Sequence, residues 1–394
     1  MKVEIKKITK GEDFLQARIN NATAFNFRVD ANCESNKEAV PFTDVYGAFV
    51  DGKLVSNIYA HKFQMMCHGE YLPMCGIGAV NSLIEYRNNG FIRKLMHTIL
   101  DDFYSAGYVY SYLYPFSKRY YSKFGYGPGG CHVNAEIPTE RLDNYKCDYD
   151  VSLYKPGDSY QPYEEVYEKF AKQYTGLVAK NDREWLCEYE PARTGKSMFL
   201  FSEKGNPKAY LGFENFYEKG GHLLTHGDIA WESPEAFRNI LGFLYKLRMH
   251  NDVFKVTLPE AFPIDAVLEE VWELKQEKST TGQVRILNIQ KALENYPCHD
   301  EKGCITINVI DDYFTSQSGV YRITFGGGNK PDVRVCDDNP DIEFDISALS
   351  PLLLGSYGFD DLLYFPKGLV KVNNNIPLLK KVFTRKPVFF TERF

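Results

Sequence analysis

The chain of 394 residues carries a formal net charge of −6, with 44% hydrophobic and 25% charged residues. This length predicts two or three domains, each large enough to bury a core without disulfides or metal ions. The negative charge argues against a non-specific nucleic-acid binder, which would show a basic face, and it mildly favours cationic substrates.

Cysteine content and hydropathy indicate the compartment. The nine cysteines include no Cys-x-x-Cys pair, and their odd number leaves at least one unpaired, so we expect reduced thiols. The N-terminal segment has no apolar signal-peptide core, and no run of about 18 apolar residues occurs. We therefore expect a cytoplasmic protein with no membrane partner. His222 and His226 could ligate a metal, but no third ligand is spaced near them, so we favour a structural role and expect no metal.

The chain begins with patterns typical of an antiparallel sheet. Residues 3–8 alternate as a short strand, and residues 12–21 show helical spacing. The dipeptides Asp51-Gly52 and His68-Gly69 each lie between β-rich runs, and Asp-Gly is a strong signal for a type I′ hairpin turn. We predict a meander whose last strand leads into the next stretch.

That stretch predicts a strand, a tight polar loop and a helix. A β-rich run at residues 76–83 meets a polar turn at residues 85–90, and apolar residues then recur at helical spacing, at Phe91, Ile92, Leu95, Met96, Ile99, Leu100 and Phe103. The turn Arg87-Asn88-Asn89-Gly90 supplies unpaired amide N–H groups at a helix N-terminus, where the helix dipole favours a phosphate. Gly107 fits the helix end, and residues 108–113 predict the next strand.

The middle of the chain repeats this order without an Arg-x-x-Gly loop. We predict a strand at residues 151–154, a helix at residues 163–173, two strands within residues 198–216 and another strand at residues 223–229. Ser233 is the expected cap of a further helix, which precedes a strand at residues 253–258.

The pattern of predicted elements changes after residue 282 to several short strands and two helices. Short strands are predicted at residues 284–289, 305–310, 320–325, 333–335 and 342–344, with a turn at residues 326–328. Helices are predicted at residues 347–354 and 376–382.

The order of motifs in the first third carries a family resemblance. An Arg-x-x-Gly turn alone is compatible with an ordinary strand–helix connection, but here the next strand is followed by Tyr-x-x-Phe-Gly-Tyr-Gly at residues 121–127. The whole order resembles the acetyl-CoA-binding core of the GCN5-related N-acetyltransferases (GNAT), most closely the Eis-like (enhanced intracellular survival) branch. The resemblance implies an α/β (α+β) protein. It would have tandem acetyltransferase-like mixed-sheet domains at residues 1–147 and 148–283, the second without the cofactor loop, and a sterol-carrier-like α+β domain at residues 284–394.

The resemblance implies which residues bind acetyl-CoA. The pyrophosphate would lie on backbone N–H groups of the loop, and Val80 and Ser82 would hold the pantetheine through their backbone. The implied set is Val80, Ser82, Arg87, Asn88, Asn89, Gly90, Phe91, Ile92 and Arg93. Asn88, Ile92 and Ile84 depart from the family, which commonly has Arg, a small residue and Pro there. A cradle built from backbone tolerates the change at Asn88, and Ile92 does not forbid backbone contact.

The resemblance also implies two catalytic groups, Tyr121 as the general acid and the C-terminal carboxylate of Phe394 as the base. A phenol pKa of about 10 lies above that of a thiol at about 8.5, so hydrogen bonding to the developing sulfur charge is the surer role for Tyr121. The alternative for Tyr121 is aromatic packing, as we assume for Tyr120 and Phe124. Residues 387–390 are too apolar for a solvated tail, which predicts that the chain end is buried.

The activity expected from the resemblance is acetyl-CoA-dependent N-acetylation of a primary amine on a polycationic small molecule, with aminoglycosides as the known substrate type of the family. Polyamines or protein lysines are alternative acceptors. A non-enzymatic lipid or small-molecule carrier is the alternative outside the enzyme class. The resemblance further implies a homo-oligomer, a hexamer in Eis-like proteins, with acetyl-CoA as cosubstrate and neither a metal nor a nucleic-acid partner.

Overall fold

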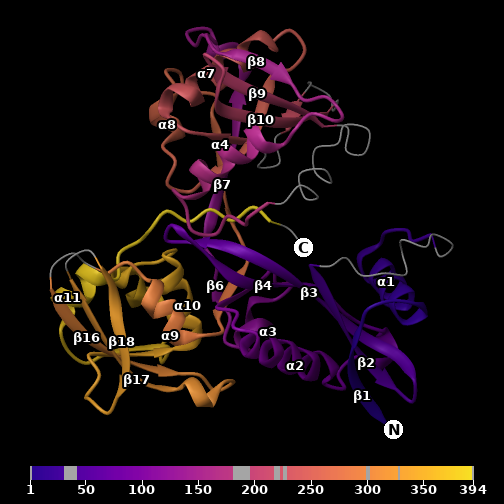
Figure 1. The fold of residues 1–394 in the computed structure, drawn as a ribbon, viewed down its shortest axis with the longest axis vertical. Coiled ribbons are helices and arrows are strands. Elements are labelled where there is room, and N and C mark those ends of the chain that lie inside the picture. Colours follow the sequence, from indigo (N-terminus) through magenta and orange to yellow (C-terminus); the bar gives the residue numbers. More distant parts are fainter. Residues whose placement is uncertain are drawn as a thin grey trace.

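The structure is a computed structural model of the chain, and it describes residues 2–30, 42–180, 196–216, 222–224, 229–298, 302–326 and 329–392. The strands of these residues form three sheets, of seven, eight and five strands, with helices packed on them (Figure 1). The mixed α/β (α+β) class predicted from the sequence is confirmed.

The first sheet has the strand order β1-β2-β3-β4-β5-β15-β6. Its strands are β1 Val3–Ile8, β2 Thr43–Val50, β3 Lys53–Cys67, β4 Glu70–Ser82, β5 Tyr110–Leu113, β6 Gly127–Pro128 and β15 Gln283–Ile286. Both predicted hairpin turns are present, because Asp51 and Gly52 as well as His68 and Gly69 have the positive φ of a type I′ turn. β4 is therefore the last strand of an antiparallel meander, as predicted.

Two helices cover opposite faces of this sheet. α1 (Glu12–Phe25), which extends further at its C-terminal end than predicted, packs with Leu54, whereas α2 (Phe91–Ser105) packs with Val55. Consecutive strand residues point to opposite faces. The apolar stripe predicted for α2 is buried at Phe91, Leu95, Met96, Ile99, Leu100 and Phe103. A 3₁₀ turn, η2 (Ile84–Tyr86), precedes the loop before α2, and α3 (Lys118–Ser122) follows β5.

The second sheet has the order β14-β7-β13-β11-β10-β9-β8, and β12 also pairs with β10. Its strands are β7 Cys131–Pro138, β8 Asp150–Leu153, β9 Ser197–Glu203, β10 Asn206–Phe216, β11 His222–Leu224, β12 Ile229–Trp231, β13 Val253–Pro259 and β14 Lys275–Thr280. Its helical elements are η3 Thr139–Leu142, α4 Gln161–Ala171, α7 Pro234–Lys246 and α8 Ile264–Val267. Ser233 caps α7 by accepting a hydrogen bond from Ala236 N, as predicted.

The strand predicted at residues 223–229 is described only at its two ends, where Leu223 and Leu224 belong to β11 and Ile229 begins β12, because residues 225–228 lie outside the described residues. Both strands pair with β10, at residues 214–216 and 209–211 respectively, but in different registers, because Glu214 pairs with Leu224 whereas Leu211 pairs with Ile229. The apolar residues Leu223, Leu224 and Ile229 favour strand, but they carry no sign of this change in register.

The third sheet has the order β18-β17-β16-β19-β20. Its strands are β16 Gly303–Ile310, β17 Gly319–Gly326, β18 Asn329–Cys336, β19 Ile342–Asp345 and β20 Val370–Val372. Its helical elements are α9 Ile289–Asn295, η4 Thr315–Gln317, α10 Ile346–Leu354, η5 Phe359–Tyr364 and α11 Ile376–Val382. The predicted strands and helices of this region are present, but the strand predicted at residues 284–289 ends at Ile286, and Ile289 begins α9. Residues 327 and 328 of the predicted turn lie outside the described residues. β20 and η5 are too short to give a periodic sequence signal.

Two strands cross the expected domain boundaries. β7 precedes the expected boundary at residue 147, yet it pairs with β13 and β14 of the second sheet. β15 includes the start of the expected third domain, yet it pairs with β5 and β6 of the first sheet. The chain thus leaves the first sheet after β6 and returns to complete it only at residue 283.

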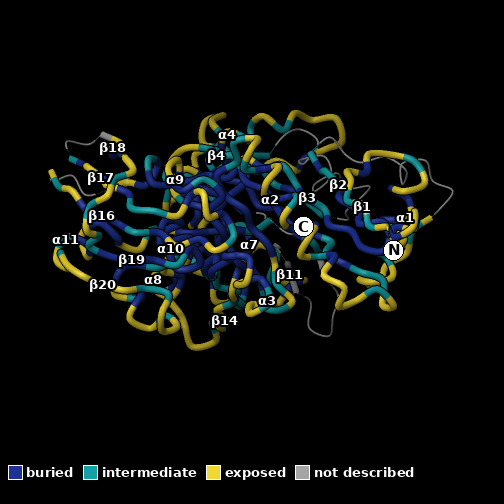
Figure 2. The backbone as a smooth tube through the Cα atoms, turned by 90° about the horizontal axis from the view of Figure 1, so that it is seen from below, coloured by how far each residue is buried: buried dark blue, intermediate teal, exposed yellow. Residues whose placement is uncertain are grey.

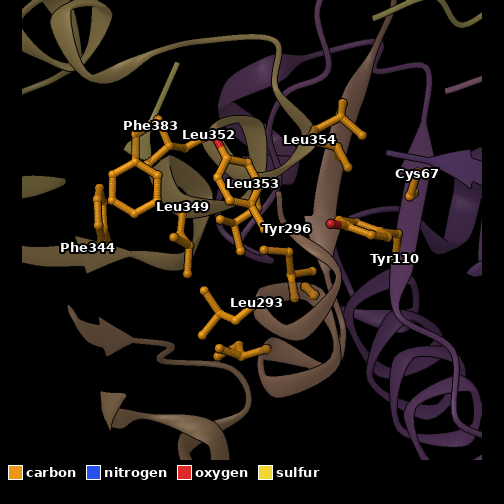
Figure 3. Close-up of a cluster of buried hydrophobic side chains, with 14 of the residues drawn as sticks. Cys67, Tyr110, Leu293, Tyr296, Phe344, Leu349, Leu352, Leu353, Leu354 and Phe383 are labelled. Carbon is orange, nitrogen blue, oxygen red and sulfur yellow. The ribbon is translucent and has the colours of Figure 1, made fainter. Parts of the chain in front are cut away.

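The third sheet shares its core with the first. Every residue of α10 is buried, and the cluster around it joins Leu349, Leu352 and Phe383 to Tyr110 and Cys67 of the first sheet (Figure 3). Buried backbone continues through the middle of the molecule in Figure 2. The C-terminal part is therefore packed firmly against the first sheet, close to the site described next.

Candidate active site

The loop before α2 holds backbone N–H groups in a fixed arrangement. Asn88 (φ 64°) and Gly90 (φ 75°) adopt left-handed conformations, which glycine and asparagine tolerate best. Asn89 Nδ2 donates hydrogen bonds to the carbonyl oxygens of Tyr86 and Arg87, both at 3.1 Å. These bonds connect the loop to η2 and restrict its shape.

The N-terminal end of α2 is free to receive an anion. Its first backbone hydrogen bond joins Lys94 N to Gly90 O at 3.1 Å, so the amides of residues 91–93 precede the helical ladder. No acidic side chain lies in the first turn. The positive end of the helix dipole is therefore not neutralised from within the helix.

The neighbouring strands β4 and β5 part beside this loop. They pair in parallel only from Met74 with Tyr110 to Ile77 with Leu113, whereas β4 continues to Ser82. At Ala79, which has a φ of 49°, a bulge also shifts the register between β4 and β3. Backbone groups of residues 78–82 that face β5 thus have no strand partner there. The sequence resemblance places Val80 and Ser82 in this segment.

A cavity of about 450 Å³ lies against the loop. It is lined by Ser82, Tyr86, Asn88, Asn89, Gly90, Phe91, Ile92, Arg93, His97, Tyr120, Lys123, Phe124, Asp312 and Tyr313. This list contains all the expected acetyl-CoA-binding residues except Val80 and Arg87. Phe91 can contribute through its backbone only, because its ring is 3% exposed and packs under α2.

Several lining residues are not indicated by the sequence motifs. Arg93 and His97 are four residues apart on α2 and so share a helix face, a spacing that could have suggested His97. Tyr120 and Phe124, which we assumed to be packing residues, line the cavity as well. Asp312 and Tyr313 come from the C-terminal part of the chain, and no sequence pattern links them to this loop.

The charges around the cavity favour an anionic ligand. Arg93 and Lys123 are exposed, and neither makes an ion pair or hydrogen bond with any residue that the structure describes. Partial burial lowers the pKa of His97, and the nearby Arg93 guanidinium adds to this shift against the opposing effect of Asp101. The lowered pKa favours the neutral form of the His97 ring.

Tyr121 lies beside the cavity and does not line it. Its side chain is 2% exposed and packs edge-on against Phe116 and Tyr120, with ring centroids 5.5 Å and 5.2 Å away. Burial raises the pKa of the Tyr121 phenol far above its usual range, and Tyr120 adds to the shift. Tyr121 therefore stays protonated and can donate a hydrogen bond, but it is a poor proton source.

The C-terminal tail packs on β5 at Tyr112, next to the last residue pair that joins β5 to β4. Thr175 holds it through hydrogen bonds of 2.9 Å from Thr175 N to Pro387 O and 2.8 Å from Phe389 N to Thr175 O. The ring of Phe390 stacks on Tyr112 of β5 at 3.8 Å and 12°. The predicted burial is confirmed from residue 388 to residue 390. Phe394 itself lies outside the described residues.

Residues 4–129 match the family described as "Acetyltransferase (GNAT) domain", and residues 289–391 match the family described as "Sterol carrier protein domain". The first domain is a GNAT acetyltransferase domain. The GNAT domain contains β4, the loop before α2 and α3, and so all of the cavity except Asp312 and Tyr313. The chain is an acetyltransferase by virtue of this domain.

Similar proteins extend the GNAT domain's likeness along the chain. An uncharacterized N-acetyltransferase of Streptomyces avermitilis is 24% identical over 309 residues, 73% of each chain. A probable N-acyltransferase from Enterococcus faecalis V583 has a similar structure, with a TM-score of 0.86 and 22% identity over 98% of this chain and 99% of the other. Eis1 from Mycobacterium abscessus gives a TM-score of 0.81 and 19% identity over 100% of both chains. At these identities the structural likeness shows a shared fold.

Other sites considered from the sequence remain without structural support. His226 and the side chain of His222 lie outside what the structure describes. Across the described ranges, no group of three His, Cys, Asp or Glu side chains is placed to hold a metal ion. Cysteines 67, 75, 131, 147, 298, 304 and 336 are free thiols. Within the same ranges no helix combines the length and apolarity needed to cross a membrane.

Proposed function

We propose that this chain is an acetyl-CoA-dependent N-acetyltransferase whose acceptor is a primary amine on a polycationic, aminoglycoside-like small molecule. The observation that supports acetyl-CoA as donor is the cavity of the GNAT domain at the N-terminal end of α2. It combines free backbone amides with two cations, Arg93 and Lys123, that have no partner in the described protein. This arrangement suits a diphosphate.

The acceptor class rests on weaker support. The net charge of −6 favours attraction of a polycation, and the fold is shared with Eis1. Polyamines and protein lysines carry the same reactive amine and are the alternative acceptors.

In the proposed reaction the amine nitrogen attacks the thioester carbonyl, and the carbon–sulfur bond breaks. The products are an acetamide and free CoA. The nitrogen loses one proton as the amide forms, and the leaving sulfur gains one to become the thiol. The hydroxyl of Tyr121 would donate a hydrogen bond to the sulfur as its charge develops. Its raised pKa supports this role over full proton transfer.

The carboxylate of Phe394 would handle the amine's proton. A terminal carboxyl has a pKa of about 3.5 and an alkyl ammonium one of about 10.4, so direct transfer is uphill by roughly 9 kcal/mol. A relay through water, with the proton leaving before attack, avoids this step. The anchoring of Phe390 on Tyr112, beside the parting of β4 and β5, supports a chain end close to the thioester.

The proposal is tested by incubating the protein with acetyl-CoA and a panel of aminoglycosides, polyamines and lysine peptides, and following free thiol. We expect release with amines, fastest with aminoglycosides. Gly90→Pro should abolish release, because proline holds φ at about −65° and cannot adopt the 75° found here. Gly90→Asn is the matched control, since asparagine tolerates the left-handed conformation, a Cβ at this position would meet nothing within 4 Å, and the amide is retained. Absence of thiol release with every amine would contradict the proposal.

A carrier function is the second candidate, favoured by the sterol-carrier match of residues 289–391. The interior of this region is occupied by α10, whose nine residues are all buried, so an apolar ligand would have to displace packed side chains. Saturable binding of a fluorescent sterol, together with no thiol release, would favour the carrier.

A further inference from the structure

A loop of the C-terminal domain, residues 311–314, reaches the cavity of the GNAT domain. It lies between β16 and η4, and its residues Asp312 and Tyr313 line the cavity together with residues of α2 and α3. The ring of Tyr313 stacks on His97 of α2, with centroids 3.8 Å apart and planes at 9°. The two domains thus meet at the wall of the cavity.

The loop is held by a buried ion pair. Asp311 accepts hydrogen bonds from Tyr313 N at 2.9 Å and Phe314 N at 3.0 Å, which sets the turn that presents Asp312 and Tyr313. Its other carboxylate oxygen binds Arg285 at 2.6 Å, and both side chains of this pair are fully buried. Arg285 also donates to the carbonyl oxygen of Phe124, which itself lines the cavity. The loop and the GNAT wall are therefore fixed to each other.

Tyr313 contacts α2 at His97, and the place of His97 along this helix indicates which part of a ligand Tyr313 would meet. His97 lies six residues beyond Phe91, or about 9 Å along the helix from the free amides at the N-terminal end of α2. Pantetheine would lie at Ser82, which ends β4 and precedes the loop before α2. A ligand whose diphosphate sits at residues 90–93 would therefore direct one arm toward Ser82 and the other toward the groove between α2 and α3. Tyr313 and Asp312 line that second end.

The chemistry of Asp312 indicates which ligand groups could bind at this end of the cavity. Its carboxylate is exposed, and it makes no hydrogen bond or ion pair with the residues that the structure describes. It lines the same cavity as Arg93 and Lys123 without pairing with either. A carboxylate repels phosphate but accepts hydrogen bonds from hydroxyl and amino groups. An aromatic ring beside it favours a flat base.

We propose that Asp312 and Tyr313 of the C-terminal domain bind the adenosine end of the acyl donor, with Tyr313 contacting the purine and Asp312 accepting hydrogen bonds from its amino group or the ribose hydroxyl. This rests on the proposed function in that the donor is acetyl-CoA. The sterol-carrier-type domain then completes the donor site of the GNAT domain.

The first test uses Asp312→Lys, because a hydrogen-bonding role and a purely electrostatic role of Asp312 predict opposite changes in acetyl-CoA affinity. Calorimetry with acetyl-CoA should show roughly fivefold weaker binding, since the acceptor for amino or hydroxyl groups is lost. If Asp312 were only a background charge, the new cation would tighten binding of this polyanion. The exposed side chain has no partner to lose in the described protein, so folding is not at risk. Unchanged or tighter binding would overturn the assignment.

The second test separates the nucleotide from the rest of the donor. Tyr313→Leu should weaken acetyl-CoA about tenfold, while the KM for S-acetylpantetheine, which lacks the nucleotide, stays within about twofold. Tyr313→Phe keeps the ring and should restore most of the acetyl-CoA affinity that Tyr313→Leu loses, because the hydroxyl has no hydrogen-bond partner among the described residues. Equal losses for both donors, or no loss for acetyl-CoA, would refute the role of Tyr313. If the wild-type protein itself does not bind acetyl-CoA, the proposed function fails and this inference with it.

Discussion

Asp311→Asn should destabilise the protein more than any change to a surface ion pair. The Arg285 guanidinium has no exposed surface and lies 2.6 Å from Asp311, so the substitution leaves a buried charge without its counter-ion. Removing one partner of such a pair typically costs about 3–5 kcal/mol. The Asn oxygen can still accept the hydrogen bonds from Tyr313 N and Phe314 N, so their loss adds little to this figure.

The double variant Arg285→Met/Asp311→Asn removes both charges and isolates the pair. Its free energy of unfolding should recover to within about 2 kcal/mol of wild type. Because the Arg285→Met single variant should also cost about 3–5 kcal/mol, the cycle gives a favourable coupling of roughly 4 kcal/mol or more. Urea unfolding followed by far-UV circular dichroism measures all three variants. Hydrogen exchange at residues 124–126 and 311–314 would locate the change.

Glu70→Gln is the matched control. Glu70 pairs with Lys330 at 2.5 Å and also joins the first sheet to the third, but both side chains are about half exposed or more. Exposed pairs contribute about 0–1 kcal/mol. If Asp311→Asn were no more destabilising than Glu70→Gln, the buried pair would not be what fixes the C-terminal loop to the GNAT domain.

Three further outcomes are expected. Tyr121→Phe should lower kcat roughly a hundredfold and leave acetyl-CoA affinity nearly unchanged, because its hydrogen bond acts on charge that develops late; turnover at the wild-type rate would make Tyr121 a packing residue. Deleting Phe394, or extending the chain beyond it, should reduce kcat/KM severely in a folded protein that still binds acetyl-CoA, and an extended variant with wild-type kinetics would remove the chain end from the mechanism. Burial lowers the pKa of His68 to about 4, opposed in part by its hydrogen bond to Leu353 O, so the unfolded chain binds the proton more tightly. Stability should then fall as the pH drops from about 6.5 toward 4, by up to about 3 kcal/mol, and a His68→Asn variant with the same slope in urea titrations would exclude His68 as the cause.

Sequence patterns predict the local parts of the site well. The strand before the loop, the tight polar turn at residues 85–90 and the apolar stripe of α2 depend on neighbouring residues, whose periodicity and turn chemistry are visible in the chain. The residues brought to the cavity from afar leave no such trace. Tyr313 lies on a loop of the C-terminal domain, and its place depends on a buried ion pair.

Arg285 illustrates how far such signals go. A charged residue in an apolar strand indicates a buried partner, but nothing in its neighbourhood identifies Asp311. Sequence patterns also fail to show that strands cross the expected domain boundaries, because strand pairing is not visible in the local sequence. β15 resembles the start of a new domain in sequence, because pairing with β5 depends on residues far earlier in the chain.

The late return of β15 has a consequence for synthesis on the ribosome. The edge of β5 that faces β15 stays unpaired until residue 283 has been made, and the order of the sheet prevents closure from within residues 1–128. At about 5–20 residues per second, the nascent sheet would wait roughly 8–30 s with an open edge. Such an edge is a template for wrong pairing between chains. Protection of this interval by a chaperone or by slow release of the nascent chain would therefore matter more here than in a protein whose strands pair in order of synthesis.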